Sequence, residues 1–211
     1  MEKLAHNLSE KIAEKLGYDQ DKKEVIAYGL TAIFQMVGIF SIASFIGIVG
    51  GFWYESMVLF LAVGLFRKST GGAHSSTFQG CIIISIFSIS FFAFLSRYLF
   101  YVNVPPHVFF ISVLSVIYIF SFLVVYKLAP VASPNKPIVR KEKIKKLKIK
   151  SLATVVFYYL ISMIFIFCSQ DNSHIRLIHI SLSLACATLW QVFTLTKTGH
   201  KLIHIMDSKL T

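Results

Sequence analysis

The sequence predicts an all-α integral membrane protein, and three observations carry that prediction. Hydrophobic residues make up 55% of the 211 residues, aromatic residues make up 15%, and the mean hydropathy is +0.69, all above the usual range of soluble domains. The apolar residues form long stretches separated by short polar ones. The basic residues, which give a net charge of +11, lie almost wholly in the polar stretches, where they orient spans and contact lipid headgroups. Nucleic-acid binding is therefore not expected.

We expect one membrane domain over residues 1–211, beginning with an amphipathic helix within residues 1–24. Its apolar residues recur at helical spacing, and Lys and Glu occupy positions between them. The apolar residues are Leu4, Ala5, Leu8, Ile12, Ala13 and Leu16. The pattern is typical of a helix lying on a membrane surface, and equally of a polar cap packed on the rest of the protein. No cleavable signal peptide is expected, because this segment has charges of both signs and no apolar core.

Six apolar segments follow, and each is a candidate transmembrane helix. They cover approximately residues 25–50, 52–66, 81–102, 107–128, 152–168 and 175–195. A helix needs about 17 to 25 residues to cross the bilayer core. The second segment is shorter, at about 22 Å for its length, so four spans with re-entrant pieces are the alternative to six.

With six spans, the chain divides into spans 1 and 2 (25–66), a cytoplasmic loop (67–81), spans 3 and 4 (82–128), a basic cytoplasmic loop (129–151), spans 5 and 6 (152–195) and a C-terminal tail (196–211). The basic residues favour this arrangement with both termini in the cytoplasm. Every Lys and Arg except Arg97 and Arg176 then falls on the cytoplasmic side, as the positive-inside rule requires. Those two lie near helix ends, where long side chains reach the headgroups. Glu55, near the outer end of the second segment, is expected to be hydrated, because a charge in mid-membrane is costly.

The loop of residues 67–81, with the sequence RKSTGGAHSSTFQGC, gathers a nucleophile, a base and flexible backbone. Cys81 begins the third span, where unpaired backbone N–H groups and the positive end of the helix favour a thiolate. Arg67 and Lys68 add positive charge nearby. His74 is the candidate base that would activate the thiol. These residues point to acyl-transfer chemistry on a cysteine.

The spacing sets a condition on that pair. Residues seven apart on a straight helix are separated by about 10 Å, which is beyond hydrogen-bond reach. The segment must therefore fold back for His74 to meet Cys81, and Gly71 and Gly72 permit such a turn. Gln79 is a candidate to orient His74, as are Ser75 and Ser76.

A purely structural interpretation of the same residues stays open on spacing alone. The two glycines would form a tight turn, His74 would be an interfacial side chain, and Cys81 would pack as a small apolar residue. No metal or cofactor is expected, because the three cysteines lack paired spacing and because two histidines four residues apart, such as His200 and His204, are more often surface residues than metal ligands.

A resemblance to a known family favours the catalytic interpretation. The pattern of Arg67, Gly71, Gly72, His74 and Cys81 resembles the accessory gene regulator B (AgrB) family of Gram-positive bacteria, as does the later run APVASPNKPI at residues 129–138. The resemblance covers most of the chain, including its length, span order and basic central loop. Family members often carry an acidic residue after Ala-Pro-x, where this chain has Ala132 and Ser133, so no third catalytic residue is named.

The resemblance implies a cysteine endopeptidase of the bacterial cell membrane, with Cys81 as nucleophile and His74 as base. Arg67 and Gly72 would support the site, and Gly71 and Gln79 are further supporting candidates from the loop itself. The substrate would be an AgrD-like propeptide, which is cut and closed into a cyclic thiolactone or lactone for quorum sensing. The resemblance also makes a homodimer reasonable. A non-catalytic peptide exporter or signalling subunit, and a membrane thiol acyltransferase, are the alternative functions.

The basic loop between the fourth and fifth spans allows two roles. Between residues 136 and 150 it holds eight basic residues and a single acid, Glu142. Such a cluster contacts anionic lipid headgroups. The second role is docking of an acidic propeptide tail, for which the candidate residues are Lys136, Arg140, Lys141, Lys143, Lys145 and Lys146.

Overall fold

The computed structural model describes residues 2–73, 75, 77–98, 107–131, 140–169 and 175–210, and these residues form helices and one isolated β-bridge. The helices are α1 (Glu2–Leu16), α2 (Gln20–Val49), α3 (Trp53–Thr70), α4 (Phe78–Tyr98), α5 (His107–Leu128), α6 (Lys141–Cys168), α7 (Ile175–Leu195) and α8 (Lys197–Leu210). Five of them, α2, α4, α5, α6 and α7, are long and apolar enough to cross a membrane. The predicted all-α, multi-pass class is confirmed.

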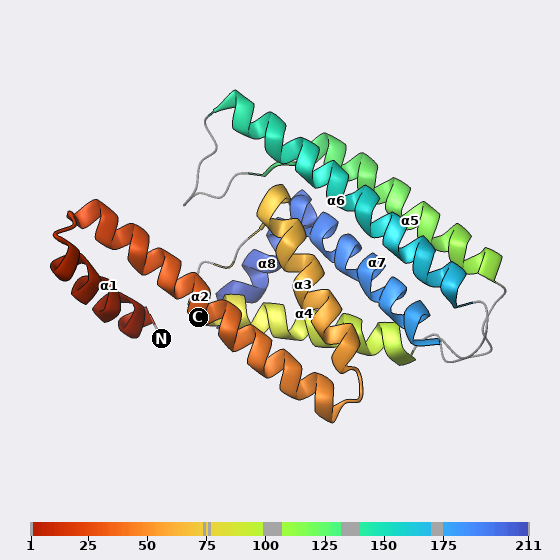
Figure 1. The fold of residues 1–211 in the computed structure, drawn as a ribbon, viewed down its shortest axis with the longest axis horizontal. Coiled ribbons are helices and arrows are strands. Elements are labelled where there is room, and N and C mark those ends of the chain that lie inside the picture. Colours follow the sequence, from red (N-terminus) through yellow and green to blue (C-terminus); the bar gives the residue numbers. More distant parts are fainter. Residues whose placement is uncertain are drawn as a thin grey trace.

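Helix α7 is the centre of the bundle. It contacts α3, α4, α5 and α6, and Figure 1 shows it between α3 and the pair formed by α5 and α6. The core around it holds large apolar side chains such as Leu59, Phe66 and Leu114. Large apolar side chains also cover the outside of the bundle, for example Phe87 and Val116, which is what lipid-facing helices require.

Small polar side chains lie between the helices, where they bond backbone or one another. The Tyr158 hydroxyl donates to the Ala62 carbonyl at 2.9 Å, and the Tyr118 and Ser162 hydroxyls are 2.8 Å apart. Ser88 and Ser183 donate to carbonyls of their own helices. Such bonds satisfy hydroxyls that have no water around them in a bilayer.

Helix α3 is longer than its apolar segment indicated. It continues four residues beyond Phe66 to Thr70 as one unbroken helix of about 27 Å, packed among α2, α4, α6 and α7. It contains Glu55, Arg67 and Lys68, and it is not among the five helices apolar enough to span a membrane. A count of six spans therefore stays a prediction.

Helices cover much of the two segments that were assigned as a basic loop and a C-terminal tail. Helix α6 begins at Lys141, so most of the basic stretch is helix rather than loop, and the expected C-terminal tail forms α8. Hydropathy marks where a chain is apolar, whereas lysine is a good helix former and continues a helix into the polar region. The ends of apolar segments and the ends of helices therefore differ.

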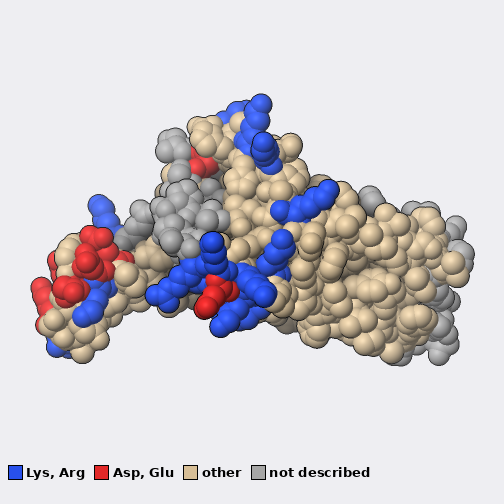
Figure 2. Space-filling view, turned by 90° about the horizontal axis from the view of Figure 1, so that it is seen from above, with Lys and Arg blue, Asp and Glu red and all other residues tan. Residues whose placement is uncertain are grey.

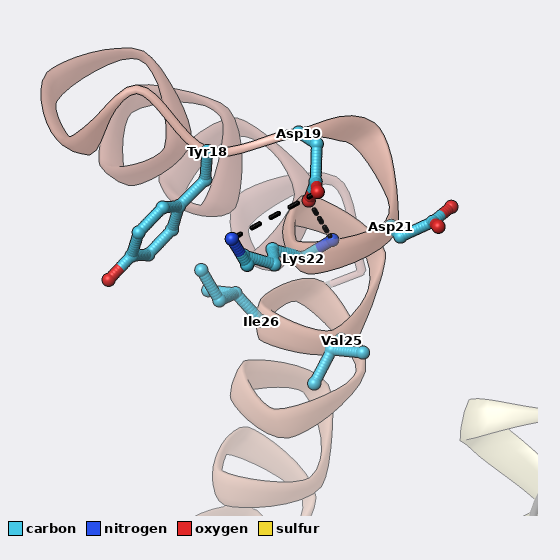
Figure 3. Close-up of a pocket in the computed structure, with 6 residues that line it drawn as sticks. All are labelled: Tyr18, Asp19, Asp21, Lys22, Val25 and Ile26. Atoms are coloured by element: carbon cyan, nitrogen blue, oxygen red, sulfur yellow. Dashed lines mark hydrogen bonds and ion pairs between the residues drawn. The ribbon is translucent and has the colours of Figure 1, made fainter.

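The N-terminal helix packs against α2 through three small residues on one face, Ala5, Ser9 and Ala13. Asp19 caps α2 by accepting from the Lys22 amide at 3.0 Å, at the surface corner drawn in Figure 3. The Lys23 ammonium lies 2.7 Å from the Glu10 carboxylate and lowers the pKa of that carboxyl. The location of α1 on a membrane surface stays a prediction.

Charge is distributed unevenly over the molecule. On the face seen in Figure 2, Lys and Arg gather over the left and the centre, whereas the right-hand part shows none. The start of α6, which carries exposed lysines, lies nearer the left in Figure 1. The end of α6 and the start of α5 lie at the right, the side that shows no Lys or Arg in Figure 2. The distribution matches a multi-pass protein with one basic end.

Glu55 and Arg97 correct two expectations. Glu55 is 1% exposed rather than hydrated, and Arg97 bonds protein groups rather than reaching only for headgroups. The Arg97 Nη1 atom lies 3.4 Å from the Glu55 carboxylate and 3.1 Å from Nδ1 of His179, which is itself 3.7 Å from Glu55. Packing of α3, α4 and α7 encloses the carboxylate, so a cation must accompany it.

We expect Glu55→Ala to destabilise the protein by about 3 kcal/mol, because it leaves a partly buried guanidinium without its counter-charge. This loss is near the lower end of the range for removing one partner of a buried ion pair, because the Arg97 side chain remains 29% exposed. Thermal unfolding in detergent measures the change, with the exposed Glu24→Ala as control. The double variant Glu55→Gln with Arg97→Gln should be more stable than Glu55→Ala. Equal melting temperatures for the wild type and Glu55→Ala would contradict a structural role for the pair.

Candidate functional site

The loop between α3 and α4 turns sharply at its two glycines. Gly71 has φ of +70° and Gly72 has φ of +121°, values that favour glycine. A side chain at Gly71 would collide with the Val131 carbonyl, and a Cβ at Gly72 would lie 2.7 Å from the Thr194 hydroxyl oxygen. Gly71 also forms a β-bridge with Val131, whose amide donates to the Thr70 carbonyl at 2.9 Å. The two glycines therefore let the loop pass close to both α7 and the chain after α5.

Arg67 fixes the backbone just beyond this turn. Its guanidinium, in the last turn of α3, donates to the Ala73 carbonyl. From the other side, the Ala73 amide donates to the Thr194 carbonyl at 3.0 Å. Ala73 is thus held by α3 and by α7, which places the preceding glycines and the following loop relative to the bundle.

Gln191 of α7 is a second anchor, which the sequence analysis did not name. Its side chain is fully buried, and its amide nitrogen donates to the Thr70 hydroxyl at 2.9 Å and to the Gly71 carbonyl at 2.7 Å. An amide side chain inside an apolar span is costly without partners. The presence of a glutamine within the apolar segment 175–195 was therefore the sequence signal that could have identified this residue. Its partners are more than a hundred residues away in sequence, so they could not be identified without the fold.

Cys81 lies in the first turn of α4 and is half-buried. The helix begins at Phe78, so the Cys81 amide is already paired, donating to the Thr77 carbonyl at 3.1 Å. This corrects the expectation of unpaired N–H groups at Cys81 itself. Arg67 is the cation that acts on the thiol, and the Ser85 hydroxyl contacts it from the next turn of the helix. Burial of the thiol is the largest influence on it and disfavours negative charge at the sulfur, whereas the Arg67 charge and the positive end of α4 favour that charge.

The thiol faces a cavity of about 480 Å³ formed by α2, α3, α4, α6 and α7. Its apolar wall includes Met36, Ile39, Leu59, Phe60, Ile89, Phe92 and Trp190. Three basic residues also line it, Arg67, Lys68 and Lys143. A mainly apolar cavity with a few polar groups is typical of a ligand site. This one can hold apolar side chains of a peptide with a carbonyl presented to Cys81.

The structure brings some of the predicted site residues together and separates others. Arg67, Gly71, Cys81 and Lys143 line one cavity. Gln79 is exposed on the first turn of α4, and the other basic candidates within the described residues are exposed at the start of α6, namely Arg140, Lys141, Lys145 and Lys146. His74, Ser76, Ala132, Ser133 and Lys136 lie outside the described residues. The pairing of His74 with Cys81 therefore stays a prediction.

Among the residues that the structure describes, no group of three or more His, Cys, Asp or Glu side chains is arranged to hold a metal ion. The cysteines are free thiols. The chemistry that the described site can perform is that of a thiol beside a cation and an apolar cavity, that is, nucleophilic attack on an acyl carbon.

Comparisons with known proteins relate the chain to one family. The model of the family described as Accessory gene regulator B matches residues 5–195. An AgrB-like protein of Clostridium perfringens strain SM101 is 31% identical over 210 residues, which are 99% of this chain and 97% of the relative. The AgrB-like protein 2 of Clostridium perfringens strain 13 is 30% identical over the same shares, and AgrB-like protein 1 of that strain is 27% identical over 78% of this chain and 84% of its own. No solved structure matches the chain.

Proposed function

This chain belongs to the accessory gene regulator B family, and on that premise we propose that it is a membrane-embedded cysteine endopeptidase that cuts an AgrD-like propeptide. The family links the chain to accessory gene regulator quorum sensing and to the membrane. The observation that carries the enzymatic proposal is the position of the Cys81 thiol, which lines an apolar cavity beside the Arg67 guanidinium. A packing cysteine needs neither a cavity nor a cation.

The proposed reaction begins with the Cys81 thiolate, formed as His74 accepts the thiol proton. The sulfur attacks a backbone carbonyl carbon of the propeptide, and the C–N bond then breaks. His74 returns the proton to the leaving amine, which departs with the C-terminal fragment. The N-terminal part stays on the enzyme as a thioester of Cys81.

Ring closure follows from acyl chemistry. A thioester is less stable than the amide it replaces, so the first step proceeds when the C-terminal fragment is lost. Attack by an internal Cys thiol or Ser hydroxyl of the peptide then expels Cys81 and gives a thiolactone or lactone. Water would hydrolyse the same thioester, so an apolar cavity that limits water favours closure.

Arg67 and the glycine turn would serve this reaction by placement. The guanidinium and α7 hold Ala73, the residue directly before His74 in sequence. Reacting groups must be placed to within about 1 Å for efficient transfer.

We also propose that both termini lie in the cytoplasm, which puts the site at the cytoplasmic face. We further propose that the protein acts as a homodimer.

The test is co-expression of the chain with an AgrD-like propeptide, with the peptide followed by mass spectrometry. A peptidase releases a C-terminal fragment, and His74→Ala should prevent that release while the protein still inserts. An exporter without chemistry would leave the peptide mass unchanged, and a thiol acyltransferase would modify a target without releasing a fragment. Either result would contradict the proposal.

Lys143 gives a prediction about substrate binding. It is the one member of the described basic candidates at the start of α6 that lines the Cys81 cavity. If it contacts an acidic propeptide tail, Lys143→Gln should raise KM by a factor of about 2 to 5 with kcat retained, the size of a single exposed ion pair. The matched control is Lys145→Gln, on the same helix and exposed. An equal change in KM for both variants would contradict a contact with the tail that is specific to Lys143.

A further inference from the structure

We propose that Asp207 in the C-terminal helix is a positioning residue of the peptidase site, holding the segment that joins the glycine turn to Cys81. This inference rests on the proposed function, and it extends the site to α8, a segment that the sequence analysis treated as a tail. Three features support it: the path of α8, the partners of the carboxylate, and the anchoring of the loop on both sides of position 74.

Helix α8 is directed back over the start of α4 by a tight turn after α7. The Gly199 amide donates to the Thr196 hydroxyl at 3.0 Å, and a side chain at Gly199 would collide with the Phe193 carbonyl. Helix α8 then contacts both α7 and α4, and Figure 1 shows it beside the first turns of α4. Gly199 lies in the first turn of α8, and its close approach to the end of α7 is thus what lets α8 turn towards the site.

One face of α8 is buried, and it carries a carboxylate. Ile203 and Asp207 are 3% and 6% exposed, and their spacing of four residues puts them on the same face. Ile203 packs in a small cluster with Ala73 and Ile84. An apolar residue at position 207 would continue that packing at no electrostatic cost, whereas a buried carboxylate needs hydrogen-bond donors.

The donors come from the loop. The hydroxyls of Ser75 and Thr77 both donate to Oδ1 of Asp207, the second at 3.0 Å. The Thr77 hydroxyl oxygen in turn accepts from the Gly80 amide at 3.1 Å. A side chain at Gly80 would collide with the Asp207 carboxylate, so the carboxylate sits directly against the first turn of α4, where the positive helix end favours it.

The two neighbours of position 74 are therefore anchored by different elements. Ala73 is held by Arg67 of α3 and by Thr194 of α7. Ser75 is held by Asp207 of α8, which also binds Thr77 at the start of the helix that carries Cys81. If His74 is the base, Asp207 sets the path of the backbone between the base and the nucleophile. That is a positioning role, distinct from contact with substrate.

Cleavage kinetics test the role. Asp207→Ala should lower kcat by about 10²-fold with KM and the amount of membrane-inserted protein unchanged, because small displacements of reacting groups cost that much. Asp207→Asn keeps an acceptor oxygen for the two hydroxyls and should recover to within about 10-fold of the wild type. The control is Ser208→Ala, the exposed neighbour on α8. An unchanged kcat in Asp207→Ala, or an Asn variant no better than the Ala variant, would overturn the proposal.

A cross-link tests the contact without any activity. Ser75→Cys combined with Asp207→Cys, in a background of Cys81→Ala, Cys168→Ser and Cys186→Ser, should form a disulfide when membranes are treated with a mild oxidant, read by mass spectrometry after proteolysis. Ser75→Cys combined with Ser208→Cys is the control and should not. A missing cross-link overturns the inference even if the peptidase is real. A cross-link in this background, together with a wild-type protein that cleaves no propeptide, would instead show that the proposed function, and with it the positioning role of Asp207, has failed.

Discussion

Replacement of Cys81 with alanine is expected to reduce propeptide cleavage by about 10³-fold or more, because the variant has no nucleophile to carry the acyl group. The sulfur is small and half-buried at the cavity wall, and its backbone bond to Thr77 does not depend on the side chain. The amount of inserted protein and its melting temperature should therefore stay close to those of the wild type. Release of the C-terminal fragment, followed by mass spectrometry, measures the effect.

Cys168 supplies the control for this prediction. Cys168 is exposed at the last residue of α6, at the opposite end of that helix from Lys143. Cys168→Ser should cleave like the wild type. Continued cleavage by Cys81→Ala, or equal losses in Cys81→Ala and Cys168→Ser, would show that the thiol at the cavity is not the nucleophile.

Replacement of Arg67 with alanine is expected to lower kcat by about 10²-fold. Two functions are lost together. The guanidinium no longer holds the Ala73 carbonyl, and the cation that acts on the Cys81 thiol is removed. Arg67→Lys keeps the charge but not the planar fork, so its activity should lie between those of Arg67→Ala and the wild type.

Single-turnover cleavage with excess enzyme isolates the chemical step in these variants. Lys201→Ala, which removes an exposed cation from α8, is the matched control for loss of positive charge and should be neutral. If Arg67→Ala changed only KM, the guanidinium would be a substrate-binding group rather than part of the support of the loop. A wild-type rate in Arg67→Ala would remove it from the site altogether.

The sequence predicted the helical class and the course of several spans well, because apolar length is a local property. Helices α5 and α7 have the bounds that the apolar segments predicted. The start of α6 at Lys141 and the existence of α8 were missed, since hydropathy reports contact with lipid rather than helix geometry.

Tertiary partners set the limit of the sequence analysis. Glu55 was expected to be hydrated because its partner Arg97 is 42 residues further along the chain. Asp207 was not named because its bonds to Ser75 and Thr77 span 132 and 130 residues. Cys81 and Arg67 were named because they share a short segment, and the family resemblance, rather than the spacing, favoured a catalytic role for them.

The most direct measurement of the central claim is the intact mass of the protein, quenched in acid soon after mixing with propeptide. The account predicts an added mass equal to the N-terminal part of the propeptide. Neutral hydroxylamine, which cleaves thioesters, should remove it, and Cys81→Ala should never acquire it. Release of the C-terminal fragment without this adduct in the wild type, or an adduct that persists in Cys81→Ala, would contradict a thioester on Cys81.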